Sequence, residues 1–89
     1  MSYHYPIDDT WSKEEVIDVV QFFSLIEQAN ESKTNREELL LKYKRFKQIV
    51  PSKSEEKKLF AQFEKHAGYA SYRVIKKANQ SVEKFISMK

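Results

Sequence analysis

Residues 12–31, SKEEVIDVVQFFSLIEQANE, decide the fold of this 89-residue chain. They begin with a predicted capping box, in which the Ser12 hydroxyl accepts the amide of Glu15 and the Glu15 carboxylate reaches back. Apolar residues then recur at helical spacing and cover most of the helix circumference. Such a helix lies either at the centre of a bundle or in an interface shared with a second subunit.

Three further stretches carry apolar residues at helical spacing, and we predict helices near 35–50, 54–67 and 71–87. Their inner faces are Leu39, Tyr43, Phe46, Ile49 and Val50; then Leu59, Phe60, Phe63 and Ala67; then Val74, Ile75, Ala78, Val82, Phe85 and Ile86. Short polar connections join the helices. The predicted fold is therefore all-α, a small four-helix antiparallel bundle or irregular helical array, in a single domain over residues 1–89.

Residues that start or stop helices mark the ends of these segments. Thr34 and Ser52 each begin a sequence typical of a capping box, with Ser54 as an alternative cap to Ser52, and Ser71 is expected to cap the last helix. Pro51 ends the second helix, because the residue before a proline leaves α geometry. Gly68, the only glycine in the chain, fits the left-handed residue that ends the third helix.

Residues 1–11 contain several aromatic side chains, including Tyr3, Tyr5 and Trp11. Pro6 restricts Tyr5 to an extended backbone. We predict an extended N-terminal arm that packs its aromatic rings on the helices, because so many rings are unfavourable in water. An exposed binding strip is the less favoured alternative.

Composition narrows the functional classes. The chain has no cysteine, which excludes disulfides and thiolate chemistry, and we expect a cytoplasmic location. The longest mostly apolar run, residues 16–26, is too short for a bilayer span of about 20 residues. The net charge is +3, but residues 1–33 carry seven acidic and two basic side chains, and residues 34–89 carry six acidic and fourteen basic ones. The basic portion either balances the acidic helix or faces an anionic partner.

Glu27 is a candidate buried charge. In helical projection it lies between Val16 and Val20, on the apolar stripe of the helix near 12–31. The favoured interpretation places it where the stripe meets solvent, because carboxylates are rarely buried without a partner. The alternative is a partly buried ion pair, for which the candidate cations are Arg36, Arg45 and Arg73.

Tyr69, Ser71, Tyr72 and Arg73 form the best candidate site, for an anion or a partner. They bring two tyrosines, a helix start and an arginine together, and free amides at a helix start can hold phosphate or carboxylate. The favoured interpretation is structural: the tyrosines clamp the corner between two helices, and Arg73 pairs with an acid such as Glu27.

No catalytic, metal or cofactor site is predicted. Asp8 and Asp9 fall short of the 6–8 oxygen ligands of a calcium site and are expected to cap a local turn. His4 and His66 lack a second histidine at helical spacing, so zinc is not expected. One glycine excludes a phosphate-binding loop. We expect no enzyme activity.

Three stretches carry a family resemblance. They are Tyr5-Pro6-Ile7-Asp8 with Trp11-Ser12, then Pro51-Ser52-Lys53-Ser54-Glu55-Glu56-Lys57, and the most specific, Gly68-Tyr69-Ala70-Ser71-Tyr72-Arg73-Val74-Ile75-Lys76-Lys77-Ala78. The chain resembles the YktA-like family of short uncharacterised proteins from Bacillus-type bacteria, nearly end to end. The resemblance implies a cytoplasmic helical protein and supplies no activity or site residue.

Two functions remain from these patterns. The favoured one is a non-catalytic protein-interaction module, which binds an unknown protein or associates with itself through the wide apolar surface of the helix near 12–31. The alternative is binding of nucleic acid through the basic faces of the second and fourth helices, which is not favoured because the acidic first helix offsets their charge. The basic residues of these faces are Lys44, Arg45 and Lys47, then Arg73, Lys76, Lys77 and Lys84. We expect no interaction with membranes.

Overall fold

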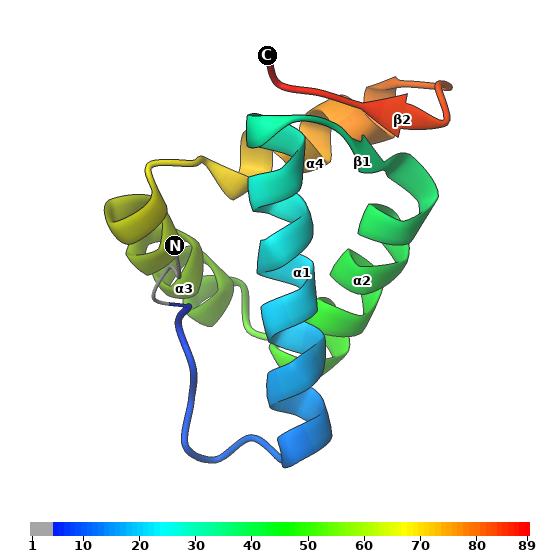
Figure 1. The fold of residues 1–89 in the computed structure, drawn as a ribbon. Helices are drawn as coiled ribbons and strands as arrows, with labels where there is room; N and C mark the ends of the chain where they lie inside the picture. Colours follow the sequence, from blue (N-terminus) through cyan, green and yellow to red (C-terminus); the bar gives the residue numbers. More distant parts are fainter. Residues whose placement is uncertain (1–4) are drawn as a thin grey trace.

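The computed structural model describes residues 5–89, which form helices and a minor two-stranded sheet. In that part of the chain the helices are α1 (Lys13–Glu31), α2 (Arg36–Ile49), α3 (Lys53–Ala67) and α4 (Ser71–Gln80), and the strands are β1 (Thr34–Asn35) and β2 (Phe85–Ile86). The predicted all-α class is confirmed (Figure 1). The predictions that concern Tyr3 and His4 lie outside the described residues.

Helix α1 runs vertically in Figure 1, with α2 on one side and α3 and α4 behind it. Its predicted capping box is confirmed: Glu15 N donates to Ser12 Oγ at 3.1 Å, and Ser12 N donates to Glu15 Oε1 at 2.8 Å. The buried residues of α1 are Val19, Phe22, Phe23, Leu25, Ile26, Glu27 and Ala29. The wide apolar surface of α1 is therefore covered mostly within the chain, and Ile17 is its one large apolar side chain left substantially exposed among the described residues.

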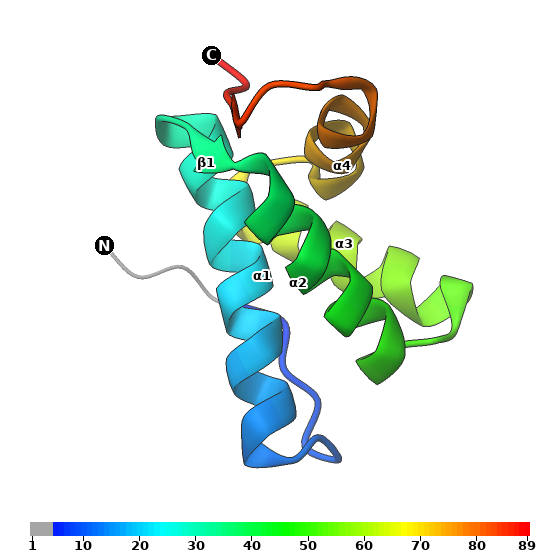
Figure 2. The same ribbon diagram turned by 90° about the vertical axis from the view of Figure 1, so that its right-hand side faces the viewer.

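The helices cross instead of lining up. Helix α4 is seen nearly end-on in Figure 2, where α1 runs vertically, so α4 lies across the end of α1. The rings of Phe22 and Phe23 point from α1 into the core, where they meet Phe46 of α2 and Phe60 and Phe63 of α3. The arrangement is the irregular helical array, held by one aromatic core.

Helix α2 begins differently from the prediction. Its N-cap is Asn35, whose side chain accepts the amide of Glu38 at 2.9 Å. Thr34 is not the cap: it belongs to β1, with its side chain buried. The pairing of Thr34 with Ile86 of β2 places the threonine in an extended strand, which leaves the next residue to start the helix.

Helix α3 follows the prediction closely. Ser52 Oγ accepts the amide of Glu55 at 3.3 Å, so the predicted cap is confirmed. Gly68 ends the helix with φ 82°, in the left-handed region, and its amide donates to the carbonyl of Glu64. The glycine is required there, because this backbone conformation costs a residue with a Cβ about 1–2 kcal/mol.

Helix α4 is shorter than predicted: it ends at Gln80, and not near residue 87. The chain then turns, and β2 pairs antiparallel with β1. The amide of Glu83 donates to Ser81 Oγ at 3.0 Å, a local turn that competes with helix. Val82 and Phe85, predicted for the inner face of the helix, are consequently 96% and 44% exposed.

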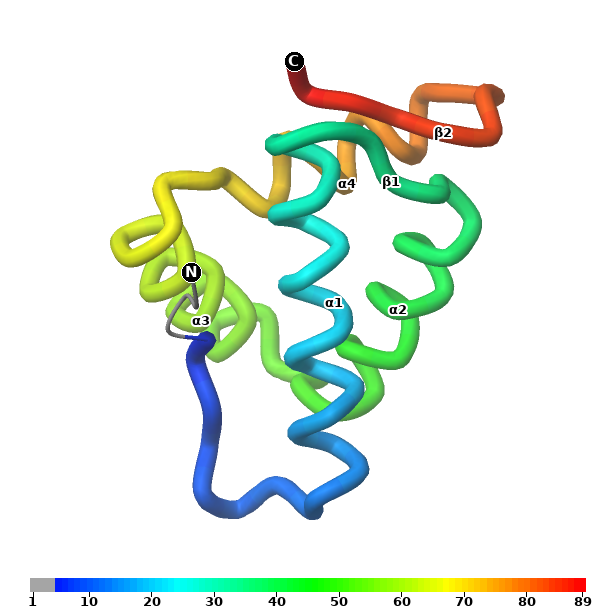
Figure 3. Tube along the Cα trace, viewed as in Figure 1, coloured from blue at the N-terminus to red at the C-terminus, as the bar shows by residue number. Residues whose placement is uncertain are grey.

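The described part of the N-terminal arm packs as predicted. It descends beside α1 and reverses into it (Figure 3). The Tyr5 ring stacks with the rings of Phe23 and Phe63, at centroid distances of 6.3 and 6.1 Å respectively. Asp8 Oδ1 accepts the amide and the hydroxyl of Thr10 at 2.8 and 2.7 Å, so Asp8 caps the local turn that was expected of it.

Candidate functional site

Basic and aromatic residues from three helices line a shallow groove of about 540 Å³ on one face of the fold. We call it the lysine–tyrosine groove. Its lining residues are Tyr43 and Lys47 of α2, Lys53 of α3, and Tyr72, Ile75, Lys76, Asn79 and Gln80 of α4. The crossing of α4 over α2 brings the basic residues together, although they are far apart along the chain.

A buried carboxylate fixes the two tyrosines. Glu56 of α3 is only 1% exposed, and its Oε2 accepts the hydroxyls of Tyr43 at 3.1 Å and Tyr72 at 2.6 Å. Burial, then the neighbouring Glu56, raises the pKa of Tyr43 to about 12 and raises the pKa of Tyr72 as well. Both tyrosine hydroxyls are therefore donors at neutral pH. Their hydrogen bonds to the buried Glu56 carboxylate hold the two rings in place.

Lysine ammonium groups lie over these rings. Lys47 Nζ is 5.3 Å from the ring centroid of Tyr43, and Lys53 Nζ is 5.7 Å from that of Tyr72. Cation–π attraction of this kind contributes about 0.5–1 kcal/mol at exposed positions. With Lys76, three positive charges surround the groove, and none of its lining residues is acidic.

Sequence reasoning found part of this groove. Lys47 and Lys76 belong to the predicted basic faces of the second and fourth helices. Glu56 was missed, although the signal was present: Leu59, Phe60 and Phe63 follow it at helical spacing, so it lies on the apolar face of α3. The same projection had singled out Glu27.

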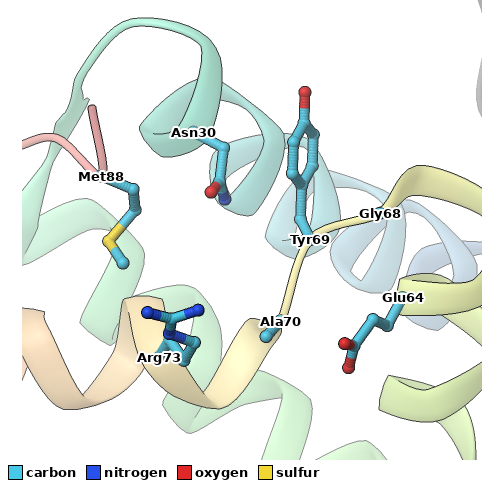
Figure 4. A pocket seen from close by; sticks show the side chains of 7 residues that line it. All are labelled: Asn30, Glu64, Gly68, Tyr69, Ala70, Arg73 and Met88. Carbon is cyan, nitrogen blue, oxygen red and sulfur yellow. The ribbon is translucent and has the colours of Figure 1, made fainter.

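The predicted cluster of Tyr69, Ser71, Tyr72 and Arg73 is divided among three places. Tyr69 and Arg73 line a small pocket of about 180 Å³ at the corner between α3 and α4 (Figure 4). Tyr72 lies in the lysine–tyrosine groove, and Ser71 is 2% exposed in the core. The four residues therefore do not form one site, because successive positions of a helix face different directions.

Ser71 does not cap α4. The N-cap is Ala70, with no side-chain hydrogen bond, and Ser71 Oγ is buried without a hydrogen-bond partner in the described part of the chain. Ser71 is the first residue of the helix and turns inward toward the core. The anion site predicted at this helix start consequently loses the hydroxyl it was expected to use.

The corner pocket carries both signs of charge. Its lining includes Asn30, Glu64, Arg73 and Met88, and Figure 4 shows the Arg73 and Glu64 side chains on different sides of the Ala70 backbone. The Tyr69 hydroxyl donates to Glu31 Oε2 at 3.0 Å, which ties the corner to the end of α1. The bond joins Tyr69 to α1, a third helix beyond the two whose corner this tyrosine was expected to clamp.

Glu27 is buried, at 7% exposure, and the prediction that it meets solvent is wrong. Its partner is not an arginine: the Tyr5 hydroxyl donates to Glu27 Oε1. Arg36 Nε donates to the Ala78 carbonyl at 2.7 Å, and Arg45 Nε binds Asp18 at 2.8 Å. Burial raises the pKa of Glu27 above its ordinary value, and the Tyr5 hydrogen bond lowers it by less.

We expect the free energy of unfolding of Glu27→Gln, measured relative to that of the wild type, to increase as the pH rises from about 4 to about 7. A carboxyl group whose pKa is raised by folding contributes its stability below the unfolded pKa, and loses it as the pH rises through the folded pKa. The glutamine does not titrate, and its amide oxygen still accepts from Tyr5. Urea unfolding at both pH values measures the difference.

The control for this test is Glu14→Gln, an exposed acid in the first turn of the same helix. It should follow the pH dependence of the wild type. A Glu27→Gln variant that loses stability relative to wild type as the pH rises would contradict the expected sign.

Among residues 5–89, no group of three or more histidine, cysteine, aspartate or glutamate side chains is arranged to hold a metal ion. Within the same range, every helix is too short or too polar to cross a lipid bilayer.

A model of the family described as "Uncharacterised protein family (UPF0223)" matches residues 2–87. A UPF0223 protein of Oceanobacillus iheyensis is 65% identical over 99% of this chain and 100% of its own. The UPF0223 protein YktA of Bacillus subtilis is 48% identical over 99% of this chain and 100% of its own. A UPF0223 protein of Staphylococcus haemolyticus is 48% identical over 93% of this chain and 92% of its own.

Proposed function

Because the chain belongs to the UPF0223 family, whose description assigns no activity, we propose a function from its surface: it is a non-catalytic interaction module that binds an acidic protein segment in the lysine–tyrosine groove. Membership confirms the resemblance to the YktA-like family. The single observation that carries the proposal is the convergence of three lysines from three helices on two anchored tyrosines.

Charge selects the partner. Lys47, Lys53 and Lys76 line the groove without an acidic neighbour in the lining, so their field attracts carboxylates. Complementary potentials of this kind raise association rates and disfavour partners of the wrong sign. A segment rich in aspartate or glutamate fits this groove best.

The tyrosines supply contact area. Tyrosine is enriched among residues that dominate binding energy, because it offers a large rigid surface at low entropic cost. Tyr72 is 37% exposed, and its hydroxyl is already bonded to Glu56. A partner can therefore cover the ring without leaving that hydroxyl unpaired.

The test uses a synthetic glutamate-rich peptide and measures its affinity by fluorescence anisotropy at near-physiological salt. The variant Lys47→Glu/Lys53→Glu/Lys76→Glu should bind at least tenfold more weakly, because it replaces attraction with repulsion at the groove. The control variant Lys57→Glu/Lys58→Glu/Lys65→Glu has the same net charge, changed at exposed positions of α3 outside the groove lining. It should retain most of the affinity.

An equal loss in the two triple variants would mean that the peptide responds to net charge alone, and would overturn the groove as the binding site. Circular dichroism of both variants verifies that the helices remain. Amide shifts in labelled protein should concentrate at Tyr72, Ile75 and Asn79 on peptide addition.

Nucleic acid is the second candidate, favoured by the meeting of Lys47 of α2 and Lys76 of α4 at one groove. Helix α4 is a poor recognition helix, because such a helix contacts base edges with residues near its N-terminal end, and two of those residues in α4, Val74 and Ile75, are buried in the core. A short single-stranded oligonucleotide distinguishes the two. Tighter binding of the oligonucleotide than of the peptide, with a steep fall in affinity as salt rises, would favour nucleic acid.

A further inference from the structure

Helix α2 presents a short apolar ridge to solvent, away from the lysine–tyrosine groove. The ridge is formed by Leu40 and Leu41, with Glu37 and Lys44 at its two ends. The same four residues border a shallow hollow of about 350 Å³ on the helix surface. Leu41 is 67% exposed, and Leu40 is half-buried against the core. An exposed leucine flanked by a second one on a helix surface is a typical element of a helix–helix contact.

The ridge is symmetric in a way that matches its own copy. Glu37 lies three residues before Leu40, and Lys44 lies three residues after Leu41. A twofold axis level with the midpoint of the two leucines and perpendicular to the helix brings each leucine against its own counterpart, Leu40 against the partner's Leu40 and Leu41 against the partner's Leu41. The same axis brings Glu37 opposite the partner's Lys44, and the reverse pair follows from the symmetry.

We propose that the protein forms a twofold symmetric dimer through antiparallel pairing of this α2 ridge. The two leucines of each copy cover each other, and two glutamate–lysine pairs flank them. This surface replaces the α1 surface that the sequence favoured for self-association, because most apolar residues of α1 are buried in the core. The proposal is independent of the groove, since no ridge residue lines it.

The neighbouring charges do not oppose this pairing. The axis places Arg36 and the partner's Arg45 at the same height but on opposite flanks of the ridge. Arg36 is held inward by its bond to the Ala78 carbonyl, and Arg45 is held by Asp18 on α1. Their charges are therefore turned away from the ridge, and the Arg45 charge is paired.

The small contact predicts reversible association. A single pair of short helices buries less than the about 800 Å² per partner of a standard stable interface. Dimers should therefore form as the protein concentration rises and dissociate on dilution. Sedimentation equilibrium over a wide concentration range measures this dissociation constant for the wild type.

Charge reversal tests the geometry. Glu37→Lys alone places like charges in both flanking pairs of the dimer, and Lys44→Glu alone does the same with the opposite sign. Each should weaken dimerisation at least tenfold. An equimolar mixture of the two variants should dimerise like the wild type, because every flanking pair then joins opposite charges.

Two controls reverse exposed charges elsewhere: Glu83→Lys and Lys57→Glu. Each should dimerise as the wild type does. A wild type that stays monomeric at all concentrations would overturn the proposal, and so would single ridge variants that dimerise like the wild type, or a mixture that fails to recover. Folding of each variant is verified by circular dichroism.

Discussion

Phe23→Ala should lower the free energy of unfolding by about 3–5 kcal/mol, the loss typical of a large aromatic removed from a core. Phe23 is fully buried, and its ring lies 4.5 Å from that of Phe63. It also contacts the rings of Tyr5, Phe22, Phe46 and Phe60, so one substitution opens the junction of the arm with three helices.

This loss is a large part of the protein's total free energy of unfolding. A chain of this length has a free energy of unfolding of only about 4–9 kcal/mol, at ~0.05–0.1 kcal/mol per residue. Urea titration followed by circular dichroism measures the change, and the variant should be substantially unfolded at 37 °C because each kcal/mol lowers the midpoint by about 4–8 °C.

The control is Ile17→Ala on the same helix, where the side chain is 46% exposed. It should lower the free energy of unfolding by less than about 1 kcal/mol, because substitutions at exposed positions usually have small effects. If Phe23→Ala cost no more than this control, the aromatic rings would not form the structural centre of the fold.

Glu56→Ala should lower the free energy of unfolding by about 2–3 kcal/mol, because two tyrosine hydroxyls lose a shared acceptor and the removed side chain leaves a space. Relief from burying a carboxylate offsets part of this loss. Thermal unfolding measures it. Peptide affinity should also fall, since Tyr43 and Tyr72 are no longer held in the groove.

One variant separates the acceptor from its charge, and a second serves as the surface control. Glu56→Gln keeps the volume and one accepting oxygen, and should cost about 1 kcal/mol, the usual value of a hydrogen bond. Glu64→Ala, at an exposed position of the same helix, should stay within about 0.5 kcal/mol. A Glu56→Ala variant as stable as Glu64→Ala would show that water replaces the carboxylate at no cost to the tyrosines.

Helix starts were predictable because their chemistry is local. Ser12 and Ser52 cap through residues three positions away, and Gly68 meets a backbone demand at its own position. Thr34 and Ser71 were assigned by the same rule and failed for a non-local reason. Thr34 pairs with Ile86 of a strand that is distant in the sequence, and the Ser71 side chain is buried in the core.

The end of α4 shows the same limit. Val82, Phe85 and Ile86 continue the helical spacing of the inner face, so the sequence favoured helix to residue 87. The chain turns instead, because β2 pairs with a segment about fifty residues earlier, and the amide of Arg36 donates to the Lys84 carbonyl. Periodicity carries no information about such a pairing.

The candidate site was predictable as residues but not as a place. Projection on a helix identified Glu27 as an acid on an apolar face. Its partner, however, is Tyr5, which belongs to the arm that precedes the helix in the sequence. Lys47, Lys53 and Lys76 meet only because three helices cross. The sequence names the charged residues, and tertiary packing decides which of them become neighbours.

The packing of the arm gives the protein a spectroscopic reporter of its own. Trp11 is the only tryptophan in the chain, and it lies half-buried against the core at the junction of the arm and α1. Its fluorescence therefore follows undocking of the arm, whereas far-ultraviolet circular dichroism follows the helices. Coincident transitions would place the arm in the cooperative unit, and an earlier fluorescence change would time its local opening.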